Sequence, residues 1–160
     1  MVGGRETLPT TQLSPPLAFQ ICLDLTRADR NLRATIAAAL KPLNLNLMQW
    51  LLLGVVETAG DKGMSISAVA RTLGVSQSQI TILGHQLTAT HLLRQKTQRA
   101  DRRSRHLWLT IKSRAILDDA EAAVSKALKK SYKSAPTNHL VFYHRVLKTI
   151  ARRSTLPLVY

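Results

Sequence analysis

The residues of this sequence whose types and spacing most clearly suggest a binding function are six cations between positions 94 and 105. They are Arg94, Lys96, Arg99, Arg102, Arg103 and Arg105. Guanidinium and ammonium groups bind phosphate well, because they combine a positive charge with directed hydrogen-bond donors. So dense a run of charge stays out of a protein core. It predicts a surface that contacts a polyanion or, as the plain alternative, a solvated loop.

The whole chain shares this positive charge. Its 160 residues carry 23 Lys and Arg against 9 Asp and Glu, for a formal net charge of +14. Such an excess favours nucleic acid or an anionic membrane surface as the partner. The longest apolar run, at residues 51–56, is far shorter than the ~18–20 residues that span a bilayer, and the N-terminus lacks the apolar segment of a secretory signal. Since the chain has a single cysteine, we expect a cytoplasmic protein without a membrane partner.

Two short helices must position the basic cluster. The first is expected to run from Ser67, whose hydroxyl can cap it, to Leu73, with Gly74 where a helix end needs positive φ. Ser76 begins the second, three residues before Gln79, in the spacing of a reciprocal capping box. Two helices across a tight turn containing Gly are typical of a helix-turn-helix.

Two strands are expected next, over residues 92–96 and 106–109, and the loop TQRADRRSR joins them. A helix-turn-helix followed by such a hairpin is a winged helix, with the basic hairpin as the wing. Further helices are expected over 14–40, 47–58, 110–132 and 138–152, after a disordered segment over 1–13. The predicted fold class is therefore mainly α with a small β wing.

Three segments stand in the order and spacing of a known family: PLNLNLMQWLLLGVV, SISAVARTLGVSQSQIT and ADRRSRHLWLT. Through them residues 43–117 resemble the MarR family of bacterial transcriptional regulators, although Ser113 stands where that family commonly has Gly. The resemblance implies a winged helix-turn-helix DNA-binding domain over 43–110. It also implies a dimerisation domain formed by the flanking helices, over 14–42 and 111–160. We therefore expect a homodimer.

The second helix of the pair is predicted to enter the major groove of double-stranded DNA. With Ile80, Leu83 and Leu87 facing inward, the helical period fixes the outward residues. The predicted contacts are Ser78, Thr81 and Ile82, with Gln77 and His85 at the margins. An outward Ile82 can meet a thymine methyl group, whereas in a rotated helix it belongs to the core. Because residues 76–93 contain no Lys or Arg, affinity must come from the basic cluster.

By the resemblance, Asp101 holds the wing through an arginine pair and Arg103 is the best candidate for the minor groove. Arginine suits a narrow, A·T-rich minor groove because the negative potential is enhanced there. A two-fold dimer would place its two recognition helices about one DNA turn apart, ~34 Å, on a pseudo-palindrome.

The resemblance also suggests two ways of regulation. Cys22 lies where organic peroxide sensors of this family carry an oxidised cysteine, which makes it a candidate redox sensor. The positions of their tyrosines hold Thr26, Ile36 and Leu47 here, which favours a small buried cysteine instead. Family members also bind small aromatic anions between the dimerisation helices and the winged helix. The residues that suggest such a pocket, or else ordinary packing and surface, are Trp50, Arg27 and Arg30.

These observations favour a sequence-specific transcriptional regulator, a repressor released by a small ligand or by thiol oxidation. The alternative is a winged-helix module for non-specific nucleic-acid binding or for a protein partner. No enzyme, cofactor or metal site is expected, because the histidines form no i, i+4 pair and no Gly-rich phosphate loop occurs. The neighbouring carboxylates Asp118 and Asp119 are expected to pair with Arg114 or Lys126.

Overall fold

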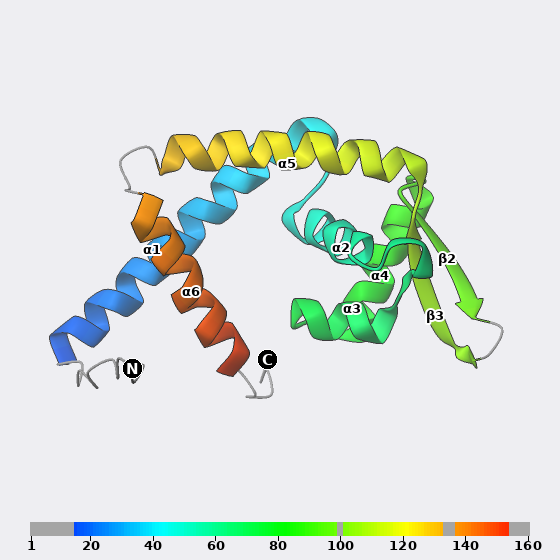
Figure 1. Cartoon of the computed structure of the whole chain (residues 1–160), viewed down its shortest axis with the longest axis horizontal. Coiled ribbons are helices and arrows are strands. Elements are labelled where there is room, and N and C mark those ends of the chain that lie inside the picture. Colours follow the sequence, from blue (N-terminus) through cyan, green and yellow to red (C-terminus); the bar gives the residue numbers. More distant parts are fainter. Residues whose placement is uncertain (1–14, 99–100, 133–136, 154–160) are drawn as a thin grey trace, which may run out of the picture.

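The computed structural model describes residues 15–98, 101–132 and 137–153. In chain order the elements are α1 (Pro15–Leu40), η1 (Lys41–Leu43), α2 (Leu47–Glu57), η2 (Gly60–Lys62), β1 (Met64–Ser65), α3 (Ile66–Leu73), α4 (Gln77–Ala89), β2 (Leu93–Gln98), β3 (Asp101–Leu109), α5 (Ile111–Ser131) and α6 (Thr137–Arg153). In Figure 1, α5 crosses the top of the molecule, with the winged helix below one end and α1 and α6 toward the other. The predicted fold class, mainly α with a small β wing, is confirmed.

Polar caps begin the helices at the places where the chain must turn. Asn46 and Gln49 form a capping box at the start of α2: each side chain accepts from the other's backbone amide, at 2.9 and 3.0 Å. Ser76 starts α4 by accepting from the Gln79 amide at 3.2 Å. The return bond to the Gln79 side chain, which the sequence predicted, is not formed between these two described residues.

The prediction that Ser67 caps α3 is wrong, because the helix begins earlier. Ser65 is the cap, and its hydroxyl accepts from the Ala68 amide at 3.2 Å. Ser65 is in extended conformation and also ends β1, so one residue serves the strand and the helix. At the other end Gly74 has φ +68°, as expected for a residue that ends a helix in the left-handed region.

One hydrophobic core joins the winged helix to the two long helices. Its centre is α2, where Leu52, Leu53 and Val56 are at most 1% exposed. The other elements add Ile36 and Leu40 of α1, Ile80 and Leu87 of α4, Leu93 and Leu107 of the sheet, and Leu117, Ala120 and Val124 of α5. Because these side chains pack on one another, the position of α4 and the wing is set by α1 and α5.

The sheet has three antiparallel strands in the order β1-β3-β2. The wing strands are longer than predicted: residues 97–98 and 101–105, expected as loop, belong to β2 and β3. Cross-strand pairing continues through them, with a bulge between Thr97 and Gln98. The sequence did not indicate β1, since two residues are too few for alternation to be visible.

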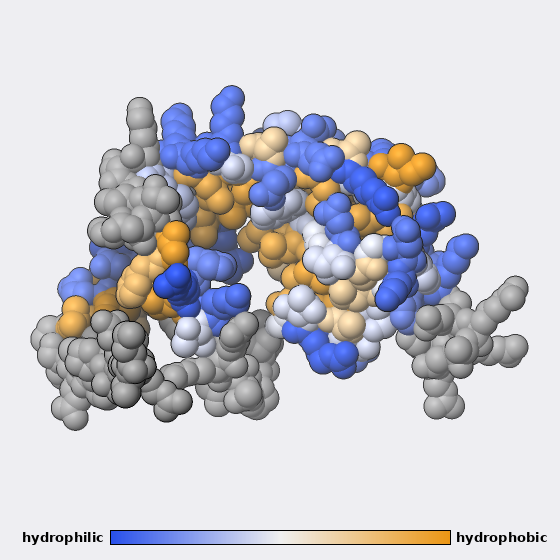
Figure 2. Space-filling view, in the orientation of Figure 1, coloured by the Kyte–Doolittle hydropathy of each residue, from blue (hydrophilic) through white to orange (hydrophobic). Residues whose placement is uncertain are grey.

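The surface of α6 and the outer part of α1 is unusually apolar. All described side chains of α6 between residues 141 and 149 are exposed. Its exposed apolar residues are Val141, Phe142, Tyr143, Val146 and Leu147, and α1 adds Leu17, Phe19, Ile21 and Leu25. Orange atoms mark this end of the molecule in Figure 2. None of the described helices, α6 included, is long and apolar enough to cross a membrane.

Candidate nucleic-acid interface

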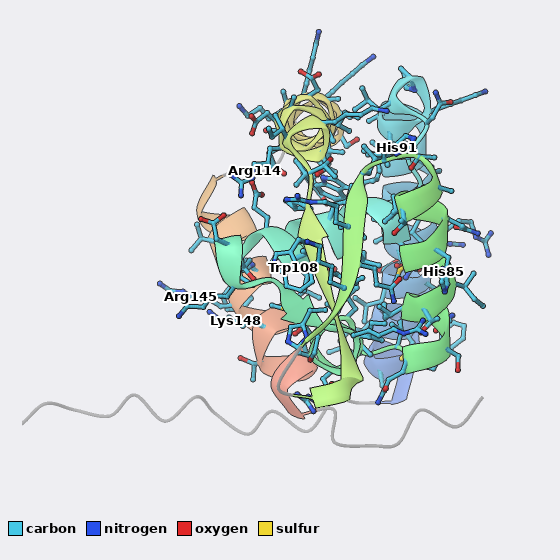
Figure 3. All side chains as sticks on the ribbon, turned by 90° about the vertical axis from the view of Figure 1, so that its right-hand side faces the viewer. His85, His91, Trp108, Arg114, Arg145 and Lys148 are labelled. Atoms are coloured by element: carbon cyan, nitrogen blue, oxygen red, sulfur yellow. The ribbon has the colours of Figure 1, made fainter. Side chains whose placement is uncertain are left out.

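The helix α4 has one buried side and one open side. Ile80 and Leu87 are buried and Leu83 is half-buried, so the predicted inward face is confirmed. On the open side, Gln77, Ser78, Ile82 and His85 are exposed and Thr81 is half-buried. Figure 3 shows His85 pointing away from the strands of the wing. The five predicted contact residues therefore share one accessible side of the helix.

Two details sharpen what this side can do. The Ile82 side chain is 58% exposed, so it points outward and is not part of the core. The Thr81 hydroxyl donates to the Gln77 carbonyl at 2.9 Å, which occupies its proton and leaves its lone pairs as acceptors. This side of the helix thus offers the aliphatic group of Ile82 and the acceptor oxygen of Thr81 to a groove, together with the polar groups of Gln77, Ser78 and His85.

The pairing register assigns the cations of the wing to different faces of the sheet. Leu107 pairs with Gln95 and lies on the inner face, where its Cδ2 would be 3.6 Å from a Cβ placed on Gly84 of α4. Side chains alternate along a strand, so Arg105 shares the inner-face parity of Leu107. Arg105 is exposed beyond the core. Arg105 is therefore the described cation of the basic cluster that has the parity of the α4 side of the sheet.

The remaining predictions for the wing concern residues with less described structure. Asp101, Arg102 and Arg103 belong to the strand β3, but their side chains lie outside the described part of the chain. Arg99 lies outside the described residues altogether. The roles predicted for these four residues stay predictions.

Comparison with known proteins places this geometry in a family. A model of the MarR family matches residues 43–104. A MarR-family transcriptional regulator from Rhodococcus sp. RHA1 is 26% identical, with a TM-score of 0.78 over 86% of this chain and 96% of that one. The segment 43–104 therefore resembles the MarR family, and the described chain has the fold of the MarR transcriptional regulators.

Two other solved structures share this fold. CouR from Rhodococcus jostii RHA1, bound to p-coumaroyl-CoA, is 24% identical with a TM-score of 0.77, covering 85% of this chain and 94% of that one. A mutant MarR from E. coli, complexed with operator DNA, is 17% identical with a TM-score of 0.72, again covering 85% and 94%. At these identities the likeness concerns the fold.

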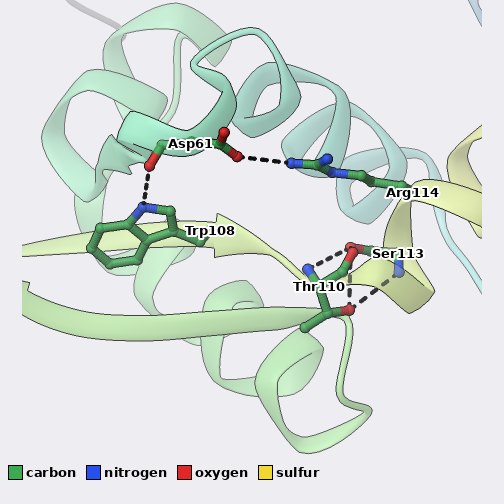
Figure 4. Close-up of polar contacts among 5 residues, drawn as sticks. All are labelled: Asp61, Trp108, Thr110, Ser113 and Arg114. Carbon is green, nitrogen blue, oxygen red and sulfur yellow. Dashed lines mark hydrogen bonds and ion pairs between the residues drawn. The ribbon is translucent and has the colours of Figure 1, made fainter.

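The outer face of the sheet carries a second group of cations, which the sequence analysis did not separate from the first. Arg94 lies opposite Trp108, and Lys96 lies opposite His106. Trp108 donates its Nε1 proton to the Asp61 carbonyl at 3.2 Å. The Asp61 carboxylate in turn accepts from Arg114 at 3.3 Å, so the prediction that Arg114 pairs with Asp118 or Asp119 is wrong (Figure 4). The alternation of side chains along the predicted strands was the sequence signal that could have separated the two groups of cations.

The junction between the wing and α5 is a closed set of hydrogen bonds (Figure 4). The Thr110 hydroxyl accepts from the Ser113 amide at 3.2 Å, and the Ser113 hydroxyl accepts from the Thr110 amide at 2.9 Å. The Thr110 hydroxyl also donates to the His91 carbonyl at 2.9 Å. Ser113 is fully buried. The residue that stands where the MarR family commonly has Gly therefore completes a capping box here.

Two further places were predicted to have regulatory roles. Trp50 lines a cavity of about 490 Å³ between α2 and α5, together with Glu57, Asp118 and Glu121 among others. Arg27 and Arg30 do not line it and are exposed on α1. Cys22 is exposed in the single chain, and the choice between a redox sensor and a small buried cysteine stays a prediction.

Proposed function

We propose that this protein is a sequence-specific transcriptional regulator that binds a pseudo-palindromic operator as a homodimer and acts as a repressor. The observation that carries the proposal is the open side of α4, with Gln77, Ser78, Thr81, Ile82 and His85 on one accessible surface. Arg105 is exposed and has the parity of the sheet face toward α4, and the proposed contacts of the wing continue through Arg99, Arg102 and Arg103. The family relationship and the net charge of +14 support a duplex as the partner.

The division of work between helix and wing follows from their charges. No Lys or Arg occurs in α4, so the helix contributes hydrogen bonds and a methyl contact, which discriminate between bases. The arginines of the wing contribute phosphate contacts, or a minor-groove contact by Arg103, and these supply the affinity and its salt dependence. Asp101 is proposed to hold the wing in place for them.

The homodimer is supported by the exposed apolar side chains of α1 and α6. An apolar surface of this kind on a chain with a basic, otherwise polar exterior marks an interaction surface. Sedimentation of Phe142→Asp, in which a side chain 66% exposed in the single chain gains a charge, should show a shift toward monomer. Lys148→Ala on the same helix is the matched control, and an equal shift in both variants would contradict this role.

The DNA-binding proposal is tested by fluorescence anisotropy with two duplexes, across a salt series. One duplex comes from the DNA upstream of the protein's own coding sequence, and the other has the same composition scrambled. We expect a preference of ~10³ or more for the first duplex. Ile82→Ala should lower that preference while leaving the salt slope unchanged, because an apolar side chain neutralises no phosphate.

The second candidate function is non-specific binding of nucleic acid, and the absence of Lys and Arg from α4 favours it. Under that function both duplexes bind alike and lose affinity together as salt rises. Scanning the upstream DNA of other genes for a preferred fragment then decides whether an operator lies elsewhere.

A small ligand is proposed to control DNA binding from the cavity beside Trp50. The carboxylates of Glu57, Asp118 and Glu121 line it, so a neutral or cationic aromatic ligand fits this cavity better than an anion. The p-coumaroyl-CoA of CouR is the ligand of that protein. The expected result is that Trp50→Ala abolishes the response of DNA affinity to such a ligand and leaves affinity without ligand unchanged.

Oxidation of Cys22 is proposed as the other means of release. The thiol is exposed in the single chain, on the helix that carries Ile21 and Leu25 of the proposed dimer surface, so its oxidation would add polar atoms beside that surface. Treatment with an organic peroxide should weaken DNA binding of the original protein and leave Cys22→Ser unaffected. Equal loss in both proteins would remove Cys22 from the proposal.

A further inference from the structure

A second cavity lies at the base of the wing, on the outer face of the sheet. Its volume is about 350 Å³, and its lining residues come from η2, both wing strands and the first turn of α5. They are Gly60, Asp61, Arg94, Lys96, Trp108, Leu109 and Arg114. In Figure 3, Trp108 and Arg114 lie on this side, whereas His85 marks the outward side of α4. The cavity is also separate from the one beside Trp50, because the two share no lining residue.

The cavity is strongly cationic. Three of its lining residues are Arg94, Lys96 and Arg114, against the single carboxylate of Asp61. Within the described part of the chain, neither Arg94 nor Lys96 has a carboxylate partner. The ion pair between Arg114 and Asp61 is solvent-exposed, with Asp61 fully so, and exposed pairs of this kind are weak. A competing anion can therefore draw on all three cations.

An aromatic wall completes the cavity, and three contacts hold it in place. The Trp108 indole donates to the Asp61 carbonyl at 3.2 Å. A Cβ placed on Gly63 would overlap three atoms of the indole, so the glycine backbone lies directly against the ring. The ring of His106, two residues before Trp108 on β3, has its centroid 5.8 Å from that of the indole. A ring fixed in this way presents an apolar surface at little entropic cost.

We propose that this cavity binds a small organic anion. Its carboxylate or phosphate group would be held by Arg94, Lys96 and Arg114, and its apolar part would rest against Trp108. A volume of about 350 Å³ falls within the range of small-molecule pockets. Because the cavity combines charge-assisted donors with a fixed aromatic wall, it should bind an organic anion more tightly than an inorganic ion.

Such a ligand would contact three parts of the chain at this surface. Arg94 and Lys96 belong to the wing, Asp61 and Gly60 to the turn after α2, and Arg114 to the first turn of α5. The proposal also reassigns Arg94, which the sequence grouped with the DNA contacts. It does not depend on the proposed operator, because the site lies on the face of the sheet opposite α4.

The test uses Trp108 as its own reporter. In Trp50→Phe, Trp108 is the remaining tryptophan, and its fluorescence is followed during titration with three probes at constant ionic strength: phenyl phosphate, benzoate and inorganic phosphate. We expect saturable binding of an organic probe, tighter than that of inorganic phosphate. Phenyl phosphate and benzoate distinguish a phosphate ligand from a carboxylate ligand. A change that rises linearly with each probe, without saturation, overturns the proposal.

Charge-matched variants decide whether Arg94 and Arg114 hold the probe. Arg94→Gln and Arg114→Gln should each weaken binding roughly tenfold, as expected for loss of a hydrogen bond to a charged group. Lys129→Gln removes the same charge from the exposed last turn of α5 and should leave binding unchanged. Equal weakening by Lys129→Gln would indicate general electrostatic attraction and overturn the site.

Two further measurements separate this site from folding and from DNA binding. Urea unfolding of Arg94→Gln should match the original protein, because the side chain is exposed. Affinity of Arg94→Gln for DNA without any organic anion should also be unchanged. If that affinity falls while binding of the organic probes stays intact, the outer face belongs to the DNA interface and the proposal is wrong.

Discussion

The two faces of the wing sheet differ in everything except the strands that form them. On the inner face Leu93, Leu107 and Leu109 are at most 8% exposed and pack on the core. On the outer face Arg94 and Lys96 border an open cavity with Trp108. Adjacent residues thus have opposite surroundings, because side chains alternate along a strand.

Because of this difference, the cations of the wing must be grouped by the face of the sheet on which they lie. Taken along the sequence, residues 94–105 form one basic cluster. Taken by register, Arg105 has the parity of the face that packs toward α4, whereas Arg94 and Lys96 lie on the other face. The net charge of a segment therefore overstates the charge that a single partner can meet, and the two groups are expected to respond to different ligands.

The largest effect is expected from the inner face. Leu107→Ala removes a side chain with no exposure from the centre of the sheet, next to α4. Substitutions of this kind destabilise a protein by about 2–5 kcal/mol, through lost burial and the cavity left behind. Urea unfolding measures the change. Lys96→Ala on the outer face should alter stability by less than ~0.5 kcal/mol, and similar losses in both would contradict the assignment of faces.

The next effect concerns the glycine that supports the aromatic wall. Gly63 has φ +65° and ψ 176°, a region that is essentially restricted to glycine, and an added Cβ would overlap Trp108. Gly63→Ala should therefore cost about 1–3 kcal/mol in stability. Gly60→Ala is the matched control, since it also has positive φ but no atom within 4 Å of an added Cβ.

A double substitution separates the two parts of this effect. Trp108→Ala in the Gly63→Ala background removes the overlap and leaves the backbone conformation. The double variant should lose less stability than the sum of the two single variants. Simple additivity would show that the indole does not press on Gly63.

Much of this fold could be predicted from local sequence signals. Asn46, Ser76 and Thr110 mark helix starts because a short polar side chain can satisfy free backbone amides. Gly74 marks a helix end because of its freedom at positive φ. The outward position of Ile82 needed the structure, because a helical stripe broken by Gly84 and Thr81 fits more than one rotation.

The cavity at the base of the wing could not be predicted in the same way. It forms between Asp61, Trp108 and Arg114. Trp108 follows Asp61 by 47 residues in the sequence, and Arg114 follows it by 53. Such contacts depend on strand register and on the packing of α5, neither of which leaves a periodic signal. The alternation of Arg94 and Lys96 was visible, but their cross-strand neighbours were not.

A smaller effect is expected for DNA affinity, and it compares the two faces directly. Arg105→Gln should weaken binding of the preferred duplex about tenfold and reduce the salt slope by ~1, as for one lost phosphate contact. Arg94→Gln removes the same charge from the outer face and should change neither quantity. Anisotropy titrations across a salt series measure both. An equal reduction in slope would mean that DNA contacts the two faces alike.

The smallest effect lies where the two faces end, at the junction with α5. Ser113→Ala removes a buried hydroxyl that accepts from the Thr110 amide at 2.9 Å and donates to the Thr110 carbonyl at 2.8 Å. The Thr110 amide keeps a second acceptor, the Leu92 carbonyl at 3.3 Å, so it is not left unpaired. The loss of stability should accordingly be about 0.5–1 kcal/mol, at the low end for a helix cap. Ser131→Ala, in the exposed last turn of the same helix, is the control and should change stability less. A loss well above that of Thr110→Ala would mean that Ser113 orients the wing, and DNA affinity would then fall as well.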